Sequence, residues 1–158
     1  MTDLREAQRL DDALQRAYRF ISKRDRTVSE VRSRLEKAEV DESTAQAAID
    51  ELTQLGYLDD ARYAQRFAED RRNLDSWGDD RIDRRLRELG VDRGEIQAAL
   101  ADRGDAPSEL DTAVALLRRR FPVVPETAKD RDRALGVLVR KGYSIDLAHD
   151  AIRALSAR

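Results

Sequence analysis

A pattern of apolar and capping residues recurs three times along this chain of 158 residues. Six positions define the first copy: Val31, Leu35, Val40, Asp41, Ala45 and Ile49. A shift of 51 residues from the first copy gives Ile82, Leu86, Val91, Asp92, Ile96 and Leu100. A shift of 103 residues gives Ala134, Leu138, Tyr143, Ser144, Ala148 and Ile152. Repetition at a period of about 50 residues is typical of tandem units that are stabilised by stacking on their neighbours.

The apolar residues inside each copy follow a helical period of three or four residues. We therefore predict an all-α fold of three tandem three-helix repeats, with about nine helices in an elongated, curved array. The expected repeats span 10–57, 58–103 and 104–158, and residues 1–9 form a flexible or exposed helical lead-in. Gly90 and Gly142 stand at equivalent positions in the second and third copies and are expected to end helices.

The segment 56–71, with the sequence GYLDDARYAQRFAEDR, forms the corner around which the chain is expected to be organised. Gly56 can adopt the left-handed conformation that closes a helix. Asp59 or Asp60 then caps the next helix by accepting a hydrogen bond from a backbone N–H group. The apolar side chains expected to pack inward here and on the neighbouring helices include Tyr18, Leu55, Tyr57, Leu58, Tyr63, Phe67, Leu74, Ile82 and Leu86.

Composition excludes several classes of function. The sequence contains no cysteine and a single histidine, His149, which excludes disulfides and argues against a histidine-based metal site. No apolar run approaches the length of a membrane span, and the start of the chain does not resemble a signal peptide, so we expect a cytoplasmic protein without membrane contact. The 30 basic and 32 acidic residues are interspersed, which argues against tight DNA binding by overall charge alone.

The sequence contains no arrangement that supports catalysis, so we do not expect an enzyme. Carboxylates are plentiful, but capping or a solvated helix face explains each of them, including the adjacent pair Asp59 and Asp60. There is no glycine-rich phosphate-binding loop, and we expect neither a metal nor a cofactor.

Clusters of cations are the candidate interaction residues. The candidates for contact with a partner or with DNA are Arg71, Arg72, Trp77, Arg81, Arg84, Arg85, Arg118, Arg119, Arg120, Arg133, Arg140 and Lys141. One interpretation is that the cations lie on solvated faces and pair with nearby acids, such as Arg84 with Glu88. The other is that they meet an acidic protein surface and DNA phosphates together. Trp77 either fills part of the core or anchors an interface.

The central motif at 56–71 resembles the signature of the RecX regulatory family. Flanking residues fit the same pattern: Arg24, Asp25, Arg26, Glu30, Val31 and Leu35 near the start, Gly78, Arg81, Ile82, Leu86, Gly90 and Val91 in the middle, and Leu138, Lys141, Gly142, Tyr143 and Ser144 near the end. Glu39 and Val40 depart from the family, which commonly has a glycine and an aromatic residue there. The resemblance covers the chain from about residue 12 to its end.

This resemblance implies a function as well as a helical fold. Members of the family bind the filament that the recombinase RecA forms on single-stranded DNA. They inhibit its ATP hydrolysis, strand exchange and co-protease activity, and so modulate DNA repair, homologous recombination and the SOS response. We therefore expect RecA and its filament as partners, weak direct DNA binding at most, and a monomeric chain. Two alternatives stay open: a direct DNA-binding regulator of helix-turn-helix type, and a scaffold repeat protein.

Overall fold

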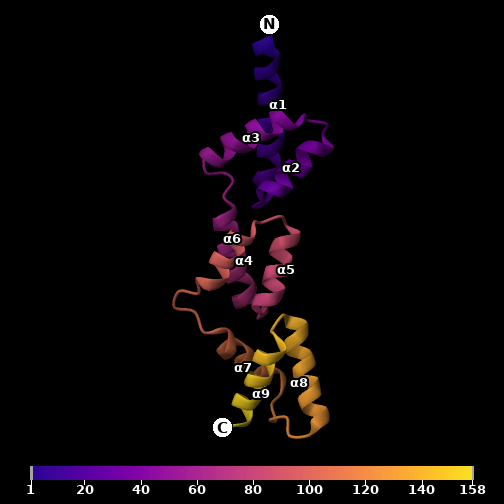
Figure 1. The fold of residues 1–158 in the computed structure, drawn as a ribbon, viewed down its shortest axis with the longest axis vertical. Coiled ribbons are helices and arrows are strands. Elements are labelled where there is room, and N and C mark those ends of the chain that lie inside the picture. The colour runs from indigo at the N-terminus through magenta and orange to yellow at the C-terminus, as the bar shows by residue number, and fades with distance from the viewer. Residues whose placement is uncertain (1, 158) are drawn as a thin grey trace.

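The computed structural model describes residues 2–157 and is all-α in this range, as the sequence predicts (Figure 1). Its nine described helices are α1 (Thr2–Lys23), α2 (Val28–Lys37), α3 (Glu42–Gln54), α4 (Asp60–Asp75), α5 (Asp79–Glu88), α6 (Arg93–Ala101), α7 (Glu109–Arg120), α8 (Ala128–Lys141) and α9 (Ile145–Ser156). The expected lead-in forms the exposed first turns of α1. Met1 and Arg158, which belong to the expected lead-in and third repeat, lie outside the described residues.

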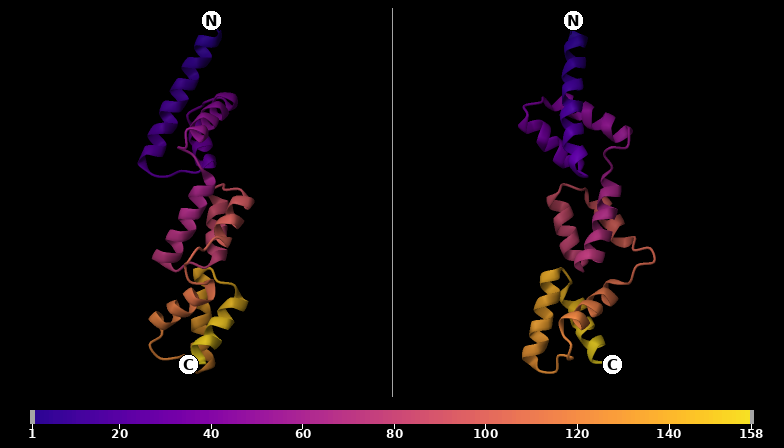
Figure 2. Two further views of the ribbon diagram at one scale, coloured as in Figure 1. Left: turned by 90° about the vertical axis from the view of Figure 1, so that its left-hand side faces the viewer. Right: turned by 180° about the vertical axis from the view of Figure 1, so that it is seen from behind.

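The helices form three units that follow one another along the long axis of an elongated molecule (Figures 1 and 2). Repeat 1 consists of α1–α3, repeat 2 of α4–α6 and repeat 3 of α7–α9, and each unit has its own apolar core. Within each unit the first helix packs against the third, as α1 does against α3 and α7 against α9. Each core is small, so the contacts between units contribute to keeping the array together.

Local signals fix the ends of several helices, and those at Gly56 and Asp59 confirm the predictions made from the sequence. Thr27 and Glu30 form both hydrogen bonds of a capping box at the start of α2. Asp59, rather than Asp60, caps α4 by accepting a hydrogen bond from the backbone N–H of Arg62. Gly56 follows α3 with a φ of 84°, in the left-handed region where glycine is favoured.

Four apolar side chains that the sequence predicts to be buried are exposed. They are Tyr18, Leu55, Tyr57 and Leu74, of which Leu55 is 63% and Leu74 72% exposed. At the corner after α3, Leu58 takes the buried position, so its neighbour Tyr57 points outward and meets the edge of Tyr18. Helical spacing alone therefore overestimates the width of the buried stripe here. Tyr63 and Phe67 are half-buried against the core of repeat 2.

The second helices of the repeats meet end to end, in the order α2, α5, α8 (Figure 1). At the lower junction, α5 begins against the end of α8: the N–H groups of Gly78 and Asp80 donate to the carbonyls of Lys141 and Gly142 at 2.8 and 3.0 Å. At the upper junction, the hydroxyl of Thr27 donates to the carbonyl of Leu89 at 2.7 Å. At the lower junction, free N–H groups at the start of α5 are thus satisfied by carbonyls at the end of α8, whereas at the upper junction a side-chain hydroxyl makes the equivalent bond.

The surroundings of Gly90 and Gly142 explain why repeats 2 and 3 have glycine at a position where repeat 1 has Glu39. A Cβ atom at Gly90 or at Gly142 would overlap the side chain of Ser29 or of Arg81 in the preceding repeat. Glu39 stands at the same position in repeat 1 and has a φ of 62°. Its corner is exposed, and within residues 2–157 no other repeat docks on it, so the close approach that requires glycine does not arise there.

Candidate interaction surfaces

The predicted cations of the central cluster gather at the junction between repeats 2 and 3. The guanidinium of Arg81 lies over the ring of Trp77, 4.1 Å from its centroid, and donates to the carbonyl of Arg140 at 3.2 Å. Arg84 follows Arg81 by one helical turn on α5 and is exposed. These three arginines, Arg81, Arg84 and Arg140, are called the junction cations below.

Trp77 packs against the core of repeat 2, which is one of the two roles that the sequence left open, and its role as an interface anchor stays a prediction. Its ring is half-buried and packs edge-on against Phe67, with the ring centroids 6.0 Å apart. Arg81 covers the ring, and the guanidinium of Arg71 lies 5.8 Å from its centroid. Cation–π contacts of this kind hold an arginine in place without neutralising its charge. Trp77 therefore belongs to the core of repeat 2 and also positions two surface cations.

Arg72 is a structural residue, contrary to its prediction as an interface cation. Its side chain is only 7% exposed and pairs with the carboxylate of Asp79 at 3.0 Å. It also donates to the carbonyl of Leu100 at 2.9 Å, which ties α4 to the end of α6. Arg103 pairs with the same Asp79 carboxylate at 3.2 Å. A guanidinium that is buried and shared in this way is not available to a partner.

Three other predicted cations are partly engaged within the molecule. Arg71 pairs with Asp75 at 2.6 Å, Lys141 donates to the carbonyl of Asp75 at 3.0 Å, and Arg119 donates to the hydroxyl of Ser76 at 2.7 Å. The latter two bonds join repeat 3 to repeat 2. Their first role is therefore to fix the junction.

The ion pair expected between Arg84 and Glu88 does not form. Arg85 takes Glu88, at 3.0 Å, which leaves Arg84 free. Five of the predicted cations are exposed and make neither an ion pair nor a side-chain hydrogen bond within residues 2–157: Arg84, Arg118, Arg120, Arg133 and Arg140.

A further basic site in repeat 1 was not predicted. A cleft of about 530 Å³ lies between α1 and the end of α2, and we call it the basic groove. Five cations line it: Arg16, Arg19, Lys23, Arg34 and Lys37. No carboxylate lines it, and no described acidic side chain lies within ion-pair distance of these five cations.

The spacing of Arg16, Arg19 and Lys23 on one face of α1 was a usable signal for this groove. That face became informative only when the structure placed Arg34 and Lys37, from the end of α2, beside it. The groove concentrates positive charge that the overall net charge of −2 conceals.

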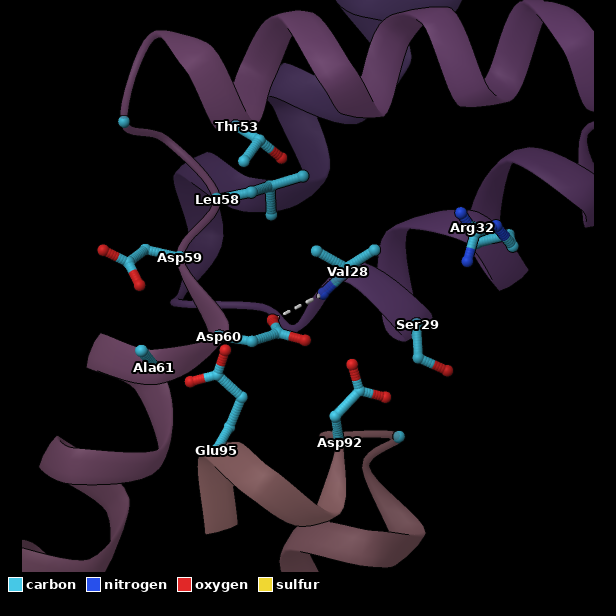
Figure 3. A pocket seen from close by; sticks show the side chains of 12 residues that line it. Val28, Ser29, Arg32, Thr53, Leu58, Asp59, Asp60, Ala61, Asp92 and Glu95 are labelled. Atoms are coloured by element: carbon cyan, nitrogen blue, oxygen red, sulfur yellow. Dashed lines mark hydrogen bonds between the residues drawn. The ribbon is translucent and has the colours of Figure 1, made fainter. Parts of the chain in front are cut away.

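An acidic cleft of about 520 Å³ lies on the junction between repeats 1 and 2 (Figure 3). Figure 3 shows Asp60, Asp92 and Glu95 lining it from α4 and the start of α6. The carboxylate of Asp60 accepts a hydrogen bond from the backbone N–H of Val28 at 2.9 Å, so it links the two repeats. Burial raises the pKa of Asp60, and the nearby charges of Asp92 and Asp59 act in the same direction.

Within the described range, no group of three or more His, Cys, Asp or Glu side chains is arranged to hold a metal ion. Asp92 stands at the N-cap position of α6 without a side-chain capping bond, contrary to expectation. His149 is exposed on α9. Among residues 2–157, no helix has the length and apolar composition needed to span a membrane.

Comparison with known families gives two adjacent matches. Residues 13–52 match the model of the first three-helix domain of RecX, and residues 59–100 match that of the second three-helix domain. Together these matches cover more than half of the chain, and their limits correspond to repeats 1 and 2. The chain belongs to the RecX family.

Matches to individual RecX proteins also cover repeat 3. This RecX-family chain is 32% identical to the regulatory protein RecX of Mycobacterium avium over 94% of this chain and 87% of that protein. It is 34% identical to that of Trichlorobacter lovleyi over 83% of this chain and 87% of the relative. The match to the protein of Lactobacillus delbrueckii is 43% identical, but it covers 54% of this chain and only 32% of that relative's length.

Solved structures show the same fold. The crystal structure of RecX from Lactobacillus salivarius superposes with a TM-score of 0.83, covering 96% of this chain and 99% of that one at 22% identity. A second crystal structure of regulatory protein RecX gives a TM-score of 0.75 over 94% of this chain and 73% of that one, also at 22% identity. At this identity the likeness establishes the fold alone.

Proposed function

We propose that this RecX-family chain is a non-enzymatic negative regulator of RecA. In this proposal it binds the RecA filament on single-stranded DNA in the cytoplasm, as a monomer. It inhibits the filament's ATP hydrolysis, strand exchange and co-protease activity, and so modulates DNA repair, recombination and the SOS response. The observation that carries the proposal is the set of unpaired cations on successive repeats of an elongated array in a chain of this family.

The arrangement of the junction cations supports contact with an extended partner. Arg84 and Arg140 belong to different repeats, and Arg81 lies between them through its bond to the Arg140 carbonyl. A partner that touches all three must therefore span a repeat boundary. A filament of identical subunits offers such a long surface, and both acidic side chains and DNA phosphates on it would attract the guanidinium groups.

A pelleting assay tests this proposal. RecA filaments on circular single-stranded DNA are sedimented with the wild-type chain, and the bound fraction is measured. Replacing Arg84 and Arg140 by Glu is expected to weaken binding about tenfold or more, since rim charges control encounter with a charged partner. Arg93→Glu is the matched control, because Arg93 is exposed at the start of α6, away from the junction between repeats 2 and 3.

Two results would contradict the proposal. If the wild-type chain stays in the supernatant when RecA is concentrated enough to coat the DNA fully, the chain does not bind the filament. Tight binding of duplex DNA without RecA, and without any effect on the filament, would instead support the helix-turn-helix alternative.

A further inference from the structure

Repeat 1 carries an exposed apolar groove of about 460 Å³ between α1 and the end of α3. Its apolar lining consists of Leu14, Tyr18, Leu52, Leu55 and Tyr57, and Gln15, Arg19 and Glu51 lie at its rim. The two tyrosines are about half exposed and meet edge to face, with their ring centroids 5.4 Å apart. We call this site the tyrosine groove.

The repeat provides an internal control for what the fold itself requires. The buried pair Ala13 and Ala17 on α1 corresponds to Ala64 and Ala68 on α4, at the common shift of 51 residues. At the same shift, four positions of the tyrosine groove have counterparts in repeat 2. Leu14, Tyr18, Leu52 and Leu55 correspond to Gln65, Glu69, Arg103 and Ala106.

These four counterparts also line a cleft, in repeat 2, and three of them are polar or charged. A three-helix unit therefore does not need apolar side chains at this position. The exposed apolar surface in repeat 1 calls for another explanation, and contact with a ligand is the usual one.

The tyrosine groove is lined by α1 and the end of α3, the basic groove by α1 and the end of α2, and the two share Arg19. A ligand that occupies both must offer planar or apolar groups at one groove and repeated negative charge at its neighbour. Single-stranded nucleic acid has this combination, since its bases are free to stack on aromatic rings while its phosphates follow a positively charged groove. Duplex DNA does not, because its bases are already stacked and paired.

We propose that repeat 1 binds single-stranded nucleic acid, with phosphates in the basic groove and a base against the Tyr18–Tyr57 pair. Charge complementarity favours this occupant: the five cations of the basic groove have no carboxylate partner within the described residues. The inference adds a single-strand binding site to the proposed function. It rests on that function only for the identity of the strand in the cell, which is the strand that RecA coats.

The test measures binding to fluorescent oligothymidylate of 20 nucleotides, which is longer than the roughly 4–16 nucleotides of a typical single-strand binding site. An abasic strand of equal length keeps the phosphates and removes the bases. Anisotropy titrations in low salt are expected to show the wild-type chain binding oligothymidylate about tenfold more tightly than the abasic strand, as for one stacked base. Both titrations are run without RecA.

Variants separate the two grooves. Joint replacement of Tyr18 and Tyr57 by Ser is expected to reduce oligothymidylate binding to the abasic level and to leave abasic binding unchanged. Replacement of both tyrosines by Phe keeps the rings and restores the difference. Arg34→Glu with Lys37→Glu is expected to weaken binding of both strands by a similar factor. Helical circular dichroism confirms that each variant is folded, since all four positions are surface positions.

Equal wild-type affinity for the two strands would overturn the inference, as would undetectable binding of both. Unchanged oligothymidylate binding by the Tyr-to-Ser variant would also overturn it. Tyrosine-dependent binding of an acidic peptide with apolar side chains, but not of oligothymidylate, would make the groove a protein-docking site. The pelleting assay distinguishes the two proposals, because filament binding through the junction cations persists if only the strand-binding inference fails.

Discussion

Gly142 and Arg81 meet across the junction between repeats 2 and 3, so closely that residue 142 has no space for a side chain. A Cβ atom at Gly142 would overlap the Cβ of Arg81 and lie 2.7 Å from its backbone nitrogen. Gly142 also has a φ of 101°, and its carbonyl accepts a hydrogen bond from Asp80. The same residue thus ends α8, permits the close approach of α5 and provides part of the bond between the repeats.

A comparison of two glycine substitutions measures the junction directly. Gly142→Ala places alanine in the left-handed region of φ and also creates a steric clash. Gly56→Ala has only the conformational cost, because no atom lies within 4 Å of a Cβ added there. We expect Gly56→Ala to lower the free energy of unfolding by about 1 kcal/mol and Gly142→Ala by about 2–4 kcal/mol. Urea denaturation followed by circular dichroism gives both values. Equal losses would show that the junction tolerates a side chain.

Glu39→Gly is expected to act in the opposite direction. Glu39 adopts a φ of 62°, which glycine accepts without a steric penalty. The gain is partly offset by the larger entropy of the unfolded glycine chain. We therefore expect an increase of about 0.5 kcal/mol in the free energy of unfolding, measured by the same denaturation. A loss of stability would mean that the Glu39 side chain has a stabilising role.

Arg72→Ala is expected to be strongly destabilising. The substitution leaves the partly buried Asp79 with Arg103 as its other ion-pair partner and removes the donor to the Leu100 carbonyl. A loss of about 2–3 kcal/mol is expected, since one member of a largely buried pair is removed. The control is Arg84→Ala, expected within about 0.5 kcal/mol of wild type because Arg84 is exposed and unpaired. Similar values for the two variants would refute the structural role of Arg72.

Asp60 makes stability depend on pH at the junction between repeats 1 and 2. Burial raises its pKa in the folded state, so the unfolded chain loses this proton at a lower pH than the folded chain does. Its contribution is therefore most favourable below about pH 4, the unfolded pKa, and is lost as pH rises through the higher folded pKa.

Asp60→Asn removes this titration and keeps an oxygen that can accept the Val28 N–H. The variant is expected to gain stability relative to wild type at pH 7 and to gain less at pH 4. Urea denaturation at the two pH values measures the difference. A larger relative gain at pH 4 would contradict the effect of burial on this carboxyl group.

Local sequence signals predicted much of the fold. The cap at Asp59 and the left-handed corner at Gly56 depend on residues that are close in sequence, and both predictions are confirmed. The resemblance carried by the 56–71 motif likewise identified the family. The expected burial of Tyr57 was wrong, because only one of the two apolar turn residues faces inward and Leu58 takes that position.

The interaction surfaces were harder to predict because they depend on which repeats meet. Arg72 follows the buried Ala64 and Ala68 at intervals of four residues, so helical spacing places it on the inner face of α4, but only the structure shows that Asp79 pairs with it there. The basic groove needed the end of α2 beside α1, which places Lys37 near Arg19. Asp60 likewise bonds Val28, 32 positions away, rather than capping its own helix.

ATP hydrolysis by RecA on single-stranded DNA, titrated with this chain, tests the central claim most directly. Binding to the bare DNA is followed by anisotropy in the same buffer. The account predicts that hydrolysis falls at concentrations of the chain too low to coat the DNA, and that Arg84→Glu with Arg140→Glu weakens this inhibition while Arg93→Glu does not. Hydrolysis that stays unchanged while the chain binds duplex DNA would contradict the account.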